Sequence, residues 1–458
     1  MIMFLKRHWF ALVMVAGLLA RLPQLVMPYW YDEAWTQWIS LLPFSCMWAA
    51  VAGDVHPVGF FVLTWLIAQV APWATRLLPL IFSLLAIVLT REIARAFELP
   101  EVVQVIAVLL MALTPWAIYF GAELRAYSML ECAVLLGWLA VLQRRWWLLG
   151  IAFYAMLQLH NLGFVYAAVI GLYALWQERR VTWWPLLAGI VAIVAYLPTS
   201  VLLQQLQQVS AGYWIPRPGL ADVLLTFYEF LFLGAHGLLM VPSMAFTVTM
   251  LILIALQWRQ SPLLLLAAGA PIGLALLASL ILPVYLNRTL IGSAPFFYLL
   301  IGKVLASNRN RVAVAALTVP LFAVLAISPA RSDMVNRYQP AAVAEVVKSA
   351  PAAPVYHLGL ALLMELHQYA LPNPQYLGLA YETISAGHYS PATMQAMGII
   401  QHPVSIAGPT WVIVTKDEDP DAPQQLAAWC ASAHCQLAFG WDDKLEPMYG
   451  VEVWKLWP

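Results

Sequence analysis

The chain has 458 residues, of which 63% are hydrophobic and only 10% are charged, and its formal net charge is zero. A mean hydropathy of +0.78 excludes an ordinary soluble globular protein and indicates a polytopic α-helical membrane protein. The net charge says nothing about partners, because the placement of Lys and Arg around the spans is what orients such a chain. We expect no nucleic-acid partner.

Apolar runs of spanning length predict about eleven transmembrane helices. The first run, 8–27, has no small-residue cleavage site that would mark a signal peptide, so we expect a retained helix. Two further apolar stretches, 57–74 and 222–236, would raise the count to about thirteen. The predicted spans are 8–27, 76–97, 101–120, 126–142, 146–159, 162–177, 182–200, 237–257, 261–283, 289–306 and 311–329.

The distribution of Lys and Arg favours the lower count, with 57–74 lying along the membrane surface. One side then receives most of the basic residues, and the positive-inside rule makes that side cytoplasmic. The N-terminus is therefore expected in the cytoplasm, and 28–75 becomes a long extracytoplasmic loop whose aromatic and apolar residues suit interfacial helices. The cytoplasmic side receives Lys6, Arg7, Arg91, Arg95, Arg144, Arg145, Arg179, Arg180, Arg259, Lys303, Arg309 and Arg311, and the outer side receives Arg21, Arg76, Arg125, Arg217 and Arg288.

Most of the unusual polar residues of the membrane part fall in the predicted outer loops. Ionisable groups near a membrane cost several kcal/mol unless they are paired or hydrated, so they are candidate functional residues. The candidates are Asp32 and Glu33 in "DEAW", His56 in "HPVGFF", Glu123, Arg125 and Tyr127 in "GAELRAYS", His160 and Asn161 in "LHN", and Asn287 and Arg288 in "VYLNRT".

The residues alone leave their roles open. Asp32 could act as a general base, because low-dielectric surroundings make a carboxylate a stronger base, or it could be a solvated helix cap, as could Glu33. His56 precedes a proline that suits a first helical turn, and it could be a cap, a metal ligand or a phosphate contact. Arg125 and Arg288 could extend toward the membrane surface, or they could present guanidinium forks to a lipid phosphate.

The composition changes after Ile327. Residues 331–458 contain the β-rich runs "APVYHLG", "TWVIVTKD" and "GVEVWKLW", with a helical "PQQLAAWCAS" between the last two. We therefore divide the chain into a transmembrane domain, 1–330, and a small α/β domain, 331–458. An odd number of spans places the second domain outside. Cys430 and Cys435 could form a disulfide there or remain two thiols.

The ordered set of motifs resembles the membrane-embedded GT-C glycosyltransferases of the protein mannosyltransferase and aminoarabinose transferase superfamily. The similarity covers about residues 8–330, and its specificity lies in the order "DEAW", "HPVGFFVLTW", "TRLLPLIFSLLAIVLTREIAR", "ELRAYSML", "LHNLGFVY" and "NRTLIGSAPFFYLL". Two positions depart from the family pattern. "HPV" stands where HPP is commoner, and Arg288 is followed by Thr289 rather than by tyrosine.

This resemblance implies a GT-C fold and transfer of a sugar, with inversion, from a polyprenyl-phosphate carrier to an acceptor hydroxyl at the outer face of the inner membrane. The acceptor would be a protein, a lipid or a cell-envelope glycan. The resemblance leaves room for a divalent metal ion at His56 and implies no other cofactor. By the motif positions, Asp32 and Glu33 would be catalytic, Arg125, Tyr127 and Arg288 would bind the donor phosphate, and His56, His160, Asn161, Glu123 and Asn287 would line the substrate pocket.

Two other functions remain as alternatives. A transporter or flippase of lipid-linked sugars should carry ionisable residues within its spans, and Glu131 is the clearest such residue. A polysaccharide polymerase or ligase should have a large outer loop between late spans. The segment "QQLQQVSAGYWIPRPG", 204–219, could close over a substrate or be an ordinary surface loop.

Overall fold

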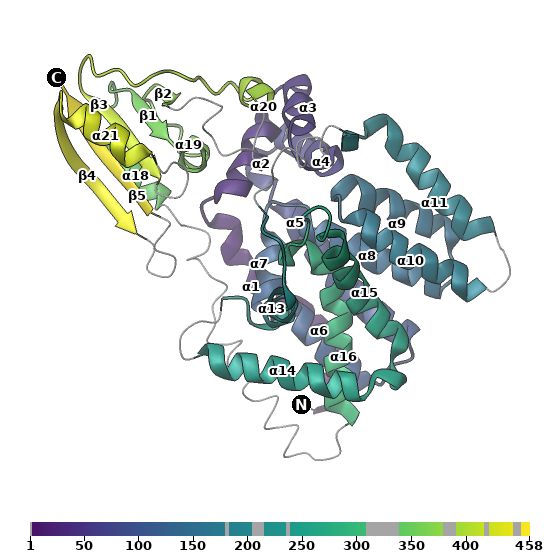
Figure 1. Cartoon of the computed structure of the whole chain (residues 1–458). Helices are drawn as coiled ribbons and strands as arrows, with labels where there is room; N and C mark the ends of the chain where they lie inside the picture. The colour runs from purple at the N-terminus through teal and green to yellow at the C-terminus, as the bar shows by residue number, and fades with distance from the viewer. Residues whose placement is uncertain are drawn as a thin grey trace.

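The structure is a computed structural model that describes residues 2–178, 183–203, 215–234, 239–307, 339–378, 391–415, 421–442 and 450–458. A large helical part is joined to a small sheet at one end of the molecule (Figure 1). The predicted span 311–329, the predicted domain boundary at 330, and residues 204–214 of the candidate closing loop lie outside the described residues.

The helical part begins with α1 and ends with α16. Its α-helices are α1 (Ile2–Arg21), α2 (Tyr31–Leu41), α3 (Phe44–Ala52), α4 (Val58–Ala68), α5 (Leu77–Ala96), α6 (Glu101–Leu113), α7 (Pro115–Ala122), α8 (Tyr127–Leu142), α9 (Trp146–Leu159), α10 (Gly163–Glu178), α11 (Trp183–Tyr196), α13 (Leu220–Phe232), α14 (Met240–Leu256), α15 (Pro262–Ala278) and α16 (Ala294–Ser307). Short 3-10 helices are η1 (Leu22–Val26), η2 (Pro72–Ala74), η3 (Leu197–Thr199), η5 (Trp258–Gln260) and η6 (Asn287–Ser293).

Within the described residues, three helical stretches are long and apolar enough to cross a membrane: Arg7–Val26, Pro72–Ala96 and Asn287–Ser307. The pair α6 and α7, bent by 54°, is a fourth candidate if it counts as one broken span. Six further apolar helices are shorter. The count of about eleven spans therefore stays a prediction.

The predicted loop 28–75 contains only short helices, as its composition suggested. The stretch 57–74, a possible extra span, is divided between α4 and η2. Because α4 has 11 residues, it is only about 16 Å long, roughly half of a bilayer core. Its length therefore supports a position along the surface.

Helix α8 lies at the centre of the helical part and packs against α5 and α9. Its residues are apolar on all sides, and almost every one of them is buried, which is the pattern of a core helix. Gly292 lets η6 lie against it, because a Cβ at that position would come within 2.9 Å of Val134. The first residue of α8 and the first turn of η6 are thus brought to the same end of the bundle.

The C-terminal region forms a five-stranded sheet in the order β2-β1-β3-β5-β4. Strand β1 is parallel to β2 and β3, whereas β5 is antiparallel to β3 and β4. This mixed α/β arrangement lies where the sequence predicted a small α/β domain. Its elements are α18 (Pro340–Lys348), β1 (Val355–Leu358), α19 (Leu360–His367), β2 (Gln375–Leu377), α20 (Pro391–Ala396), β3 (Thr410–Thr415), α21 (Ala422–Cys430), β4 (His434–Asp442) and β5 (Gly450–Trp457).

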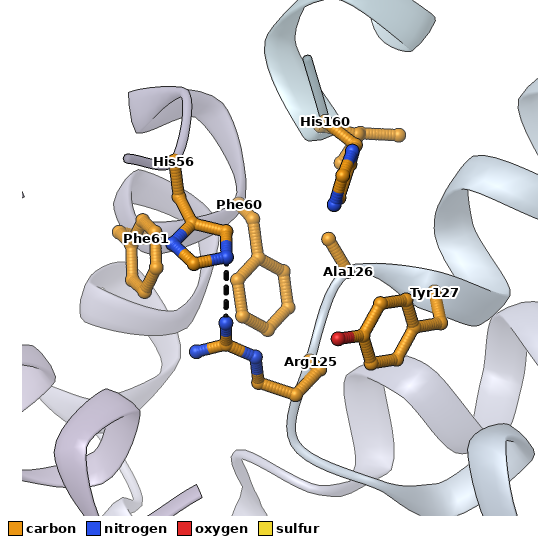
Figure 2. A pocket seen from close by; sticks show the side chains of 8 residues that line it. His56, Phe60, Phe61, Arg125, Ala126, Tyr127 and His160 are labelled. Carbon is orange, nitrogen blue, oxygen red and sulfur yellow. Dashed lines mark hydrogen bonds between the residues drawn. The ribbon is translucent and has the colours of Figure 1, made fainter. Parts of the chain in front are cut away.

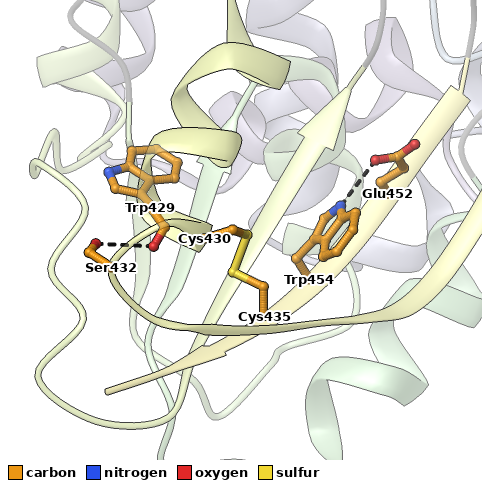
Figure 3. The surroundings of a disulfide bond; sticks show 6 residues. All are labelled: Trp429, Cys430, Ser432, Cys435, Glu452 and Trp454. Carbon is orange, nitrogen blue, oxygen red and sulfur yellow. Dashed lines mark hydrogen bonds between the residues drawn. A yellow bond between two sulfur atoms is a disulfide. The ribbon is translucent and has the colours of Figure 1, made fainter.

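A disulfide between Cys430 and Cys435 joins the end of α21 to β4 (Figure 3). The sequence left open whether these two residues were bridged. Cys46 and Cys132 are free thiols. Structural disulfides are typical of oxidising compartments, which agrees with the predicted outer location of this region.

Candidate active site

Asp32 stands in the first turn of α2, where the unpaired backbone N–H groups of a helix start favour a negative charge. Its Oδ2 lies 3.4 Å from Nη2 of Arg288 and 4.0 Å from Nε of Arg125. The side chain is 14% exposed. A carboxylate is thus held between two guanidinium groups that come from η6 and from the loop 123–126 before α8.

Arg125 is fixed by partners on α2 and on the segment before α4. Its Nη2 donates to Nε2 of His56 over 2.8 Å (Figure 2), and its Nη1 donates to the carbonyl of Asp32 and to Oγ1 of Thr36. Arginine can only donate, so Nε2 of His56 is an acceptor and the ring proton is on Nδ1. Nδ1 in turn lies 2.6 Å from Oδ2 of the buried Asp54.

A small pocket, with a cavity volume of about 10 Å³, lies beside this chain of contacts. Figure 2 shows Tyr127 and His160 on the far side of the pocket from His56. Its lining is His56, Phe60, Phe61, Arg125, Ala126, Tyr127, Leu159 and His160. The lining thus combines aromatic rings with one guanidinium group around a space for about one water molecule.

His160 and Asn161 connect the start of α10 to this pocket. Burial, with the neighbouring Arg125 charge, lowers the pKa of His160 to about 3, so its imidazole is neutral. Its Nδ1 accepts from the backbone N–H of Leu162. Asn161 donates to the carbonyl of Val55, one residue before His56.

Glu33 lies apart from Asp32, although the two are adjacent in sequence. Its carboxylate receives Nε of Arg76 at 2.9 Å and Nη2 at 2.6 Å, and also the backbone N–H of Leu124 at 2.7 Å. Both side chains of the pair are almost fully buried. Successive helical residues point about 100° apart, so one acid faces the two arginines and the other faces the protein interior.

Glu123 is buried between these two groups. Its Oε1 accepts from Nε1 of Trp30 at 2.9 Å, and its Oε2 has no hydrogen-bond partner among the described residues. Burial, and then the charge of Glu33, raises the pKa of Glu123 to about 8, so the group is mostly protonated at neutral pH. A second small pocket lies on this side, lined by Gln24, Met27, Glu33, Arg76, Tyr119, Ala122 and Glu123.

Arg288 and Asn287 point to different groups. The guanidinium of Arg288 stands 5.8 Å from the ring centre of Trp30, next to Asp32. Asn287 accepts from Oγ1 of Thr226 and donates to Oε2 of Glu229 on α13. The structure thus brings Arg288 to Asp32 and places Asn287 in a neighbouring polar cluster.

The described residues contain no group of three or more His, Cys, Asp or Glu side chains that could hold a metal ion. Both ring nitrogens of His56 have protein partners. A metal ion at His56 would have to displace Asp54 or Arg125 from the ring, and its presence stays a prediction.

Sequence reasoning missed four residues that build this site. Asp54 sets the ring orientation of His56, Arg76 neutralises Glu33, and Thr36 and Trp30 contact Arg125 and Glu123. Asp54 lies two residues before the His56 of "HPVGFF", and an acid so close to a candidate histidine was a usable signal. Arg76 was visible only as an outer-face charge, because its partner is 43 residues away.

Comparisons with known proteins found no matching family model and no matching curated protein. Two solved structures match nearly the whole chain. ArnT from Cupriavidus metallidurans in the apo state has a TM-score of 0.61 at 14% identity, with 98% of each chain covered. The same protein bound to undecaprenyl phosphate has a TM-score of 0.59 at 13% identity, with 97% of this chain and 98% of that chain covered. The chain has the GT-C fold.

The resemblance drawn from the ordered motifs is therefore confirmed at the level of the fold. The first outer motif and the motif before α8 meet at one end of the GT-C helical part, although they are about 90 residues apart. The motif that opens η6 meets them there.

Proposed function

We propose that the protein is a membrane glycosyltransferase that moves a sugar from a polyprenyl-phosphate carrier to an acceptor hydroxyl, with inversion at the anomeric carbon. The transfer takes place at the extracytoplasmic face of the membrane. The observation that carries the proposal is Asp32 between Arg125 and Arg288, at distances of 4.0 and 3.4 Å. A base next to two phosphate-binding cations is what this reaction needs. The GT-C fold, shared with an ArnT that binds undecaprenyl phosphate, supports the same class of donor.

In the proposed reaction, Asp32 removes the proton of the acceptor hydroxyl while the hydroxyl oxygen attacks the anomeric carbon. The bond from that carbon to the carrier phosphate breaks, and the phosphate leaves with the electron pair. Arg288 and Arg125 stabilise the negative charge that the leaving phosphate gains. Their guanidinium groups can bind two phosphate oxygens at once.

The apo geometry adds a requirement for the donor. Two cations beside Asp32 stabilise its charged form and make it a weak base. A donor phosphate competes with Asp32 for both guanidinium groups, so its arrival leaves Asp32 less neutralised and more basic. Binding of the donor therefore prepares the base, which limits proton removal to the loaded enzyme.

The remaining predicted residues take different parts in this proposal. Tyr127, His160 and the rings of α4 line the small pocket beside Arg125 and would have to move apart to admit the carrier end of the donor. Glu123 is a neutral carboxyl that can donate from Oε2 toward the reacting groups. Glu33, expected to be catalytic, is assigned a structural part, because its oxygens are already occupied by Arg76 and Leu124.

The transporter alternative predicted ionisable groups within the spans, and Arg21 and Glu131 are indeed buried there. However, Arg21 donates to Ser83 and to the carbonyls of Gly17, Met111, Ala112 and Ala117. A guanidinium with this many fixed acceptors is a structural support that holds α1 to α5 and α6. The Arg21 guanidinium is therefore accounted for by the fold and is no sign of a transport path.

The proposal is tested with purified protein and a panel of polyprenyl-phosphate sugars, following release of polyprenyl phosphate and transfer of the sugar. We expect one donor to be consumed, and Asp32→Asn to lower kcat by roughly 10²- to 10⁴-fold. Glu101→Gln, an acid in the first turn of α6, is the matched control and should retain activity. Consumption of no donor, or equal rates for Asp32→Asn and wild type, would overturn the proposal.

A further inference from the structure

The segment just before Asp32 is extended and needs partners for its backbone. Met27 and Trp30 have extended φ and ψ angles, and α2 begins only at Tyr31. An extended segment makes no hydrogen bonds within itself, so its N–H and C=O groups must be paired elsewhere. On one side, Arg76 donates to the carbonyls of Met27 and Pro28.

On the other side, Gln368 from the C-terminal region pairs with Tyr29. The backbone N–H of Tyr29 donates to Oε1 of Gln368 at 2.9 Å, and Nε2 of Gln368 donates to the carbonyl of Tyr29 at 3.1 Å. Nε2 also donates to the carbonyl of Glu365 at 2.7 Å, which orients the amide. A carboxamide can accept and donate in this way, whereas an ionised carboxylate can only accept.

Contacts along α2 extend this attachment. Trp38 stacks on His367 with ring centres 3.8 Å apart and planes within 7°. Tyr31, the residue next to Asp32, packs against the apolar core of the sheet region. Helix α19, which ends at His367, lies beside α2, and α20 lies beside α3 (Figure 1). The helix that carries Asp32 is thus held at its first turn and again two turns later.

We infer that the C-terminal region is part of the catalytic apparatus, and that Gln368 is a positioning residue for Asp32. This inference rests on the proposed function. Asp32 is three residues from the Tyr29 backbone that Gln368 holds, and its Oδ2 must stay within reach of Arg288 and Arg125. A displacement of about 1 Å at a reacting group can lower a rate by about 10²-fold. Gln368 acts through the backbone and touches no reacting atom.

The test replaces the amide by a group of similar shape that forms no hydrogen bonds. In Gln368→Met we expect kcat to fall by about tenfold to a hundredfold, with the donor KM within about twofold of wild type, because the phosphate-binding arginines are untouched. Gln424→Met changes an exposed glutamine on α21 and should leave kcat unchanged. The unfolding temperature of Gln424→Met should match that of wild type, whereas that of Gln368→Met should fall by only a few degrees, because few hydrogen bonds are lost.

Hydrogen exchange provides a measurement that needs no donor. The amide of Tyr29 should exchange several times faster in Gln368→Met than in wild type or Gln424→Met, whereas amides in α8 should not change. A wild-type kcat in Gln368→Met, or a loss of kcat with unchanged exchange at Tyr29, would overturn the inference and leave the proposed function in place. If wild type consumes no donor, the proposed function fails. Unchanged exchange of the Tyr29 amide in Gln368→Met would overturn the positioning contact as well.

Discussion

At the scale of single residues, the two arginines at Asp32 differ in how they are held. Arg125 is buried and has His56, Thr36 and the Asp32 carbonyl as partners. Arg288 is more open, with a side chain that is 24% exposed and 3.4 Å from the Asp32 carboxylate. Arg288 is therefore the cation that can most easily turn from Asp32 to an incoming phosphate.

We predict that Arg288→Ala raises the donor KM by roughly tenfold to a hundredfold, since a charge-assisted hydrogen bond is worth about 1.5–3 kcal/mol. Arg288→Lys should recover part of this loss, because it keeps the charge but not the fork. Steady-state kinetics with varied donor measure both. Arg145→Ala, at an exposed arginine of the predicted cytoplasmic side, is the control, and an unchanged donor KM in Arg288→Ala would exclude a role in phosphate binding.

Glu123 gives a second prediction, because burial raises its pKa to about 8. Below pH 8 the Glu123 carboxyl is neutral. Above pH 8 it becomes a carboxylate near Asp32, and its negative charge repels the donor phosphate. The donor KM should therefore rise as pH passes 8, and Glu123→Gln should remove this rise. Because the pKa of Glu123 is higher in the folded protein than in the unfolded chain, folding takes up a proton between these two values. The contribution of Glu123 to the free energy of unfolding is therefore largest below about pH 4.5 and is lost as the pH rises through 8.

A donor titration at pH values from about 6.5 to 9.5, which brackets the shifted value, tests the Glu123 prediction. If the donor KM depends on pH in the same way in Glu123→Gln and wild type, a group other than Glu123 causes the rise. His160, with a pKa near 3, does not titrate in this range and cannot account for it.

The motifs predicted which residues gather, but not how they pair. Asp32, Arg125, His56 and Arg288 were visible because polar groups are rare in so apolar a chain and because loop order placed them on one face. The different partners of Asp32 and Glu33 could not be predicted. They depend on how α2 is rotated relative to Arg76, and that rotation is set by packing between segments far apart in the sequence. The contacts of Asn287 could not be predicted for the same reason: its neighbour Arg288 turns to Asp32, while Asn287 turns to α13.

At the scale of elements, the break between α6 and α7 shows what local sequence can reveal. We predicted one span over 101–120, and the structure bends there by 54°. Pro115 disfavours helical geometry at Thr114 and lacks an N–H, and Oγ1 of Thr114 accepts from Ala117 at the new helix start. The sequence Thr114-Pro115 therefore indicated a helix break. The bend directs α7 toward the loop that carries Glu123 and Arg125.

The Glu33–Arg76 pair joins the start of α2 to the start of α5. Breaking a buried pair leaves an uncompensated charge, so Glu33→Gln should lower the free energy of unfolding by about 3–5 kcal/mol. Glu92→Gln is the matched control, because its pair with Arg95 has side chains that are 37% and 52% exposed, and it should cost less than about 0.5 kcal/mol. Thermal or denaturant unfolding in detergent measures both.

Equal stability of Glu33→Gln and wild type would mean that the pair is not a structural support. A large loss of kcat in a fully stable Glu33→Gln would restore Glu33 to the catalytic part that the family resemblance implied.

At the scale of the whole molecule, the orientation in the membrane can be tested on either side of α5. This helix of 20 residues is about 30 Å long, and we place its start outside and its end in the cytoplasm. In a Cys46→Ser background, Trp73→Cys should react with an impermeant maleimide in intact cells, whereas Ala96→Cys should react only after the membrane is opened. Labelling of both positions from the same side would contradict the orientation used here.

The buried arginines also determine what the site-bearing end of the molecule presents to lipids. Of the five arginines assigned to that face, Arg21, Arg76 and Arg125 are buried and Arg288 is largely covered, which leaves Arg217 exposed. In the described helical part, positive charge on this face is thus gathered inside the protein and not spread over its surface. A phosphate therefore meets more positive charge in the site than on the helical surface around it. Buried charges are screened weakly by salt, and donor recognition should accordingly change little with ionic strength.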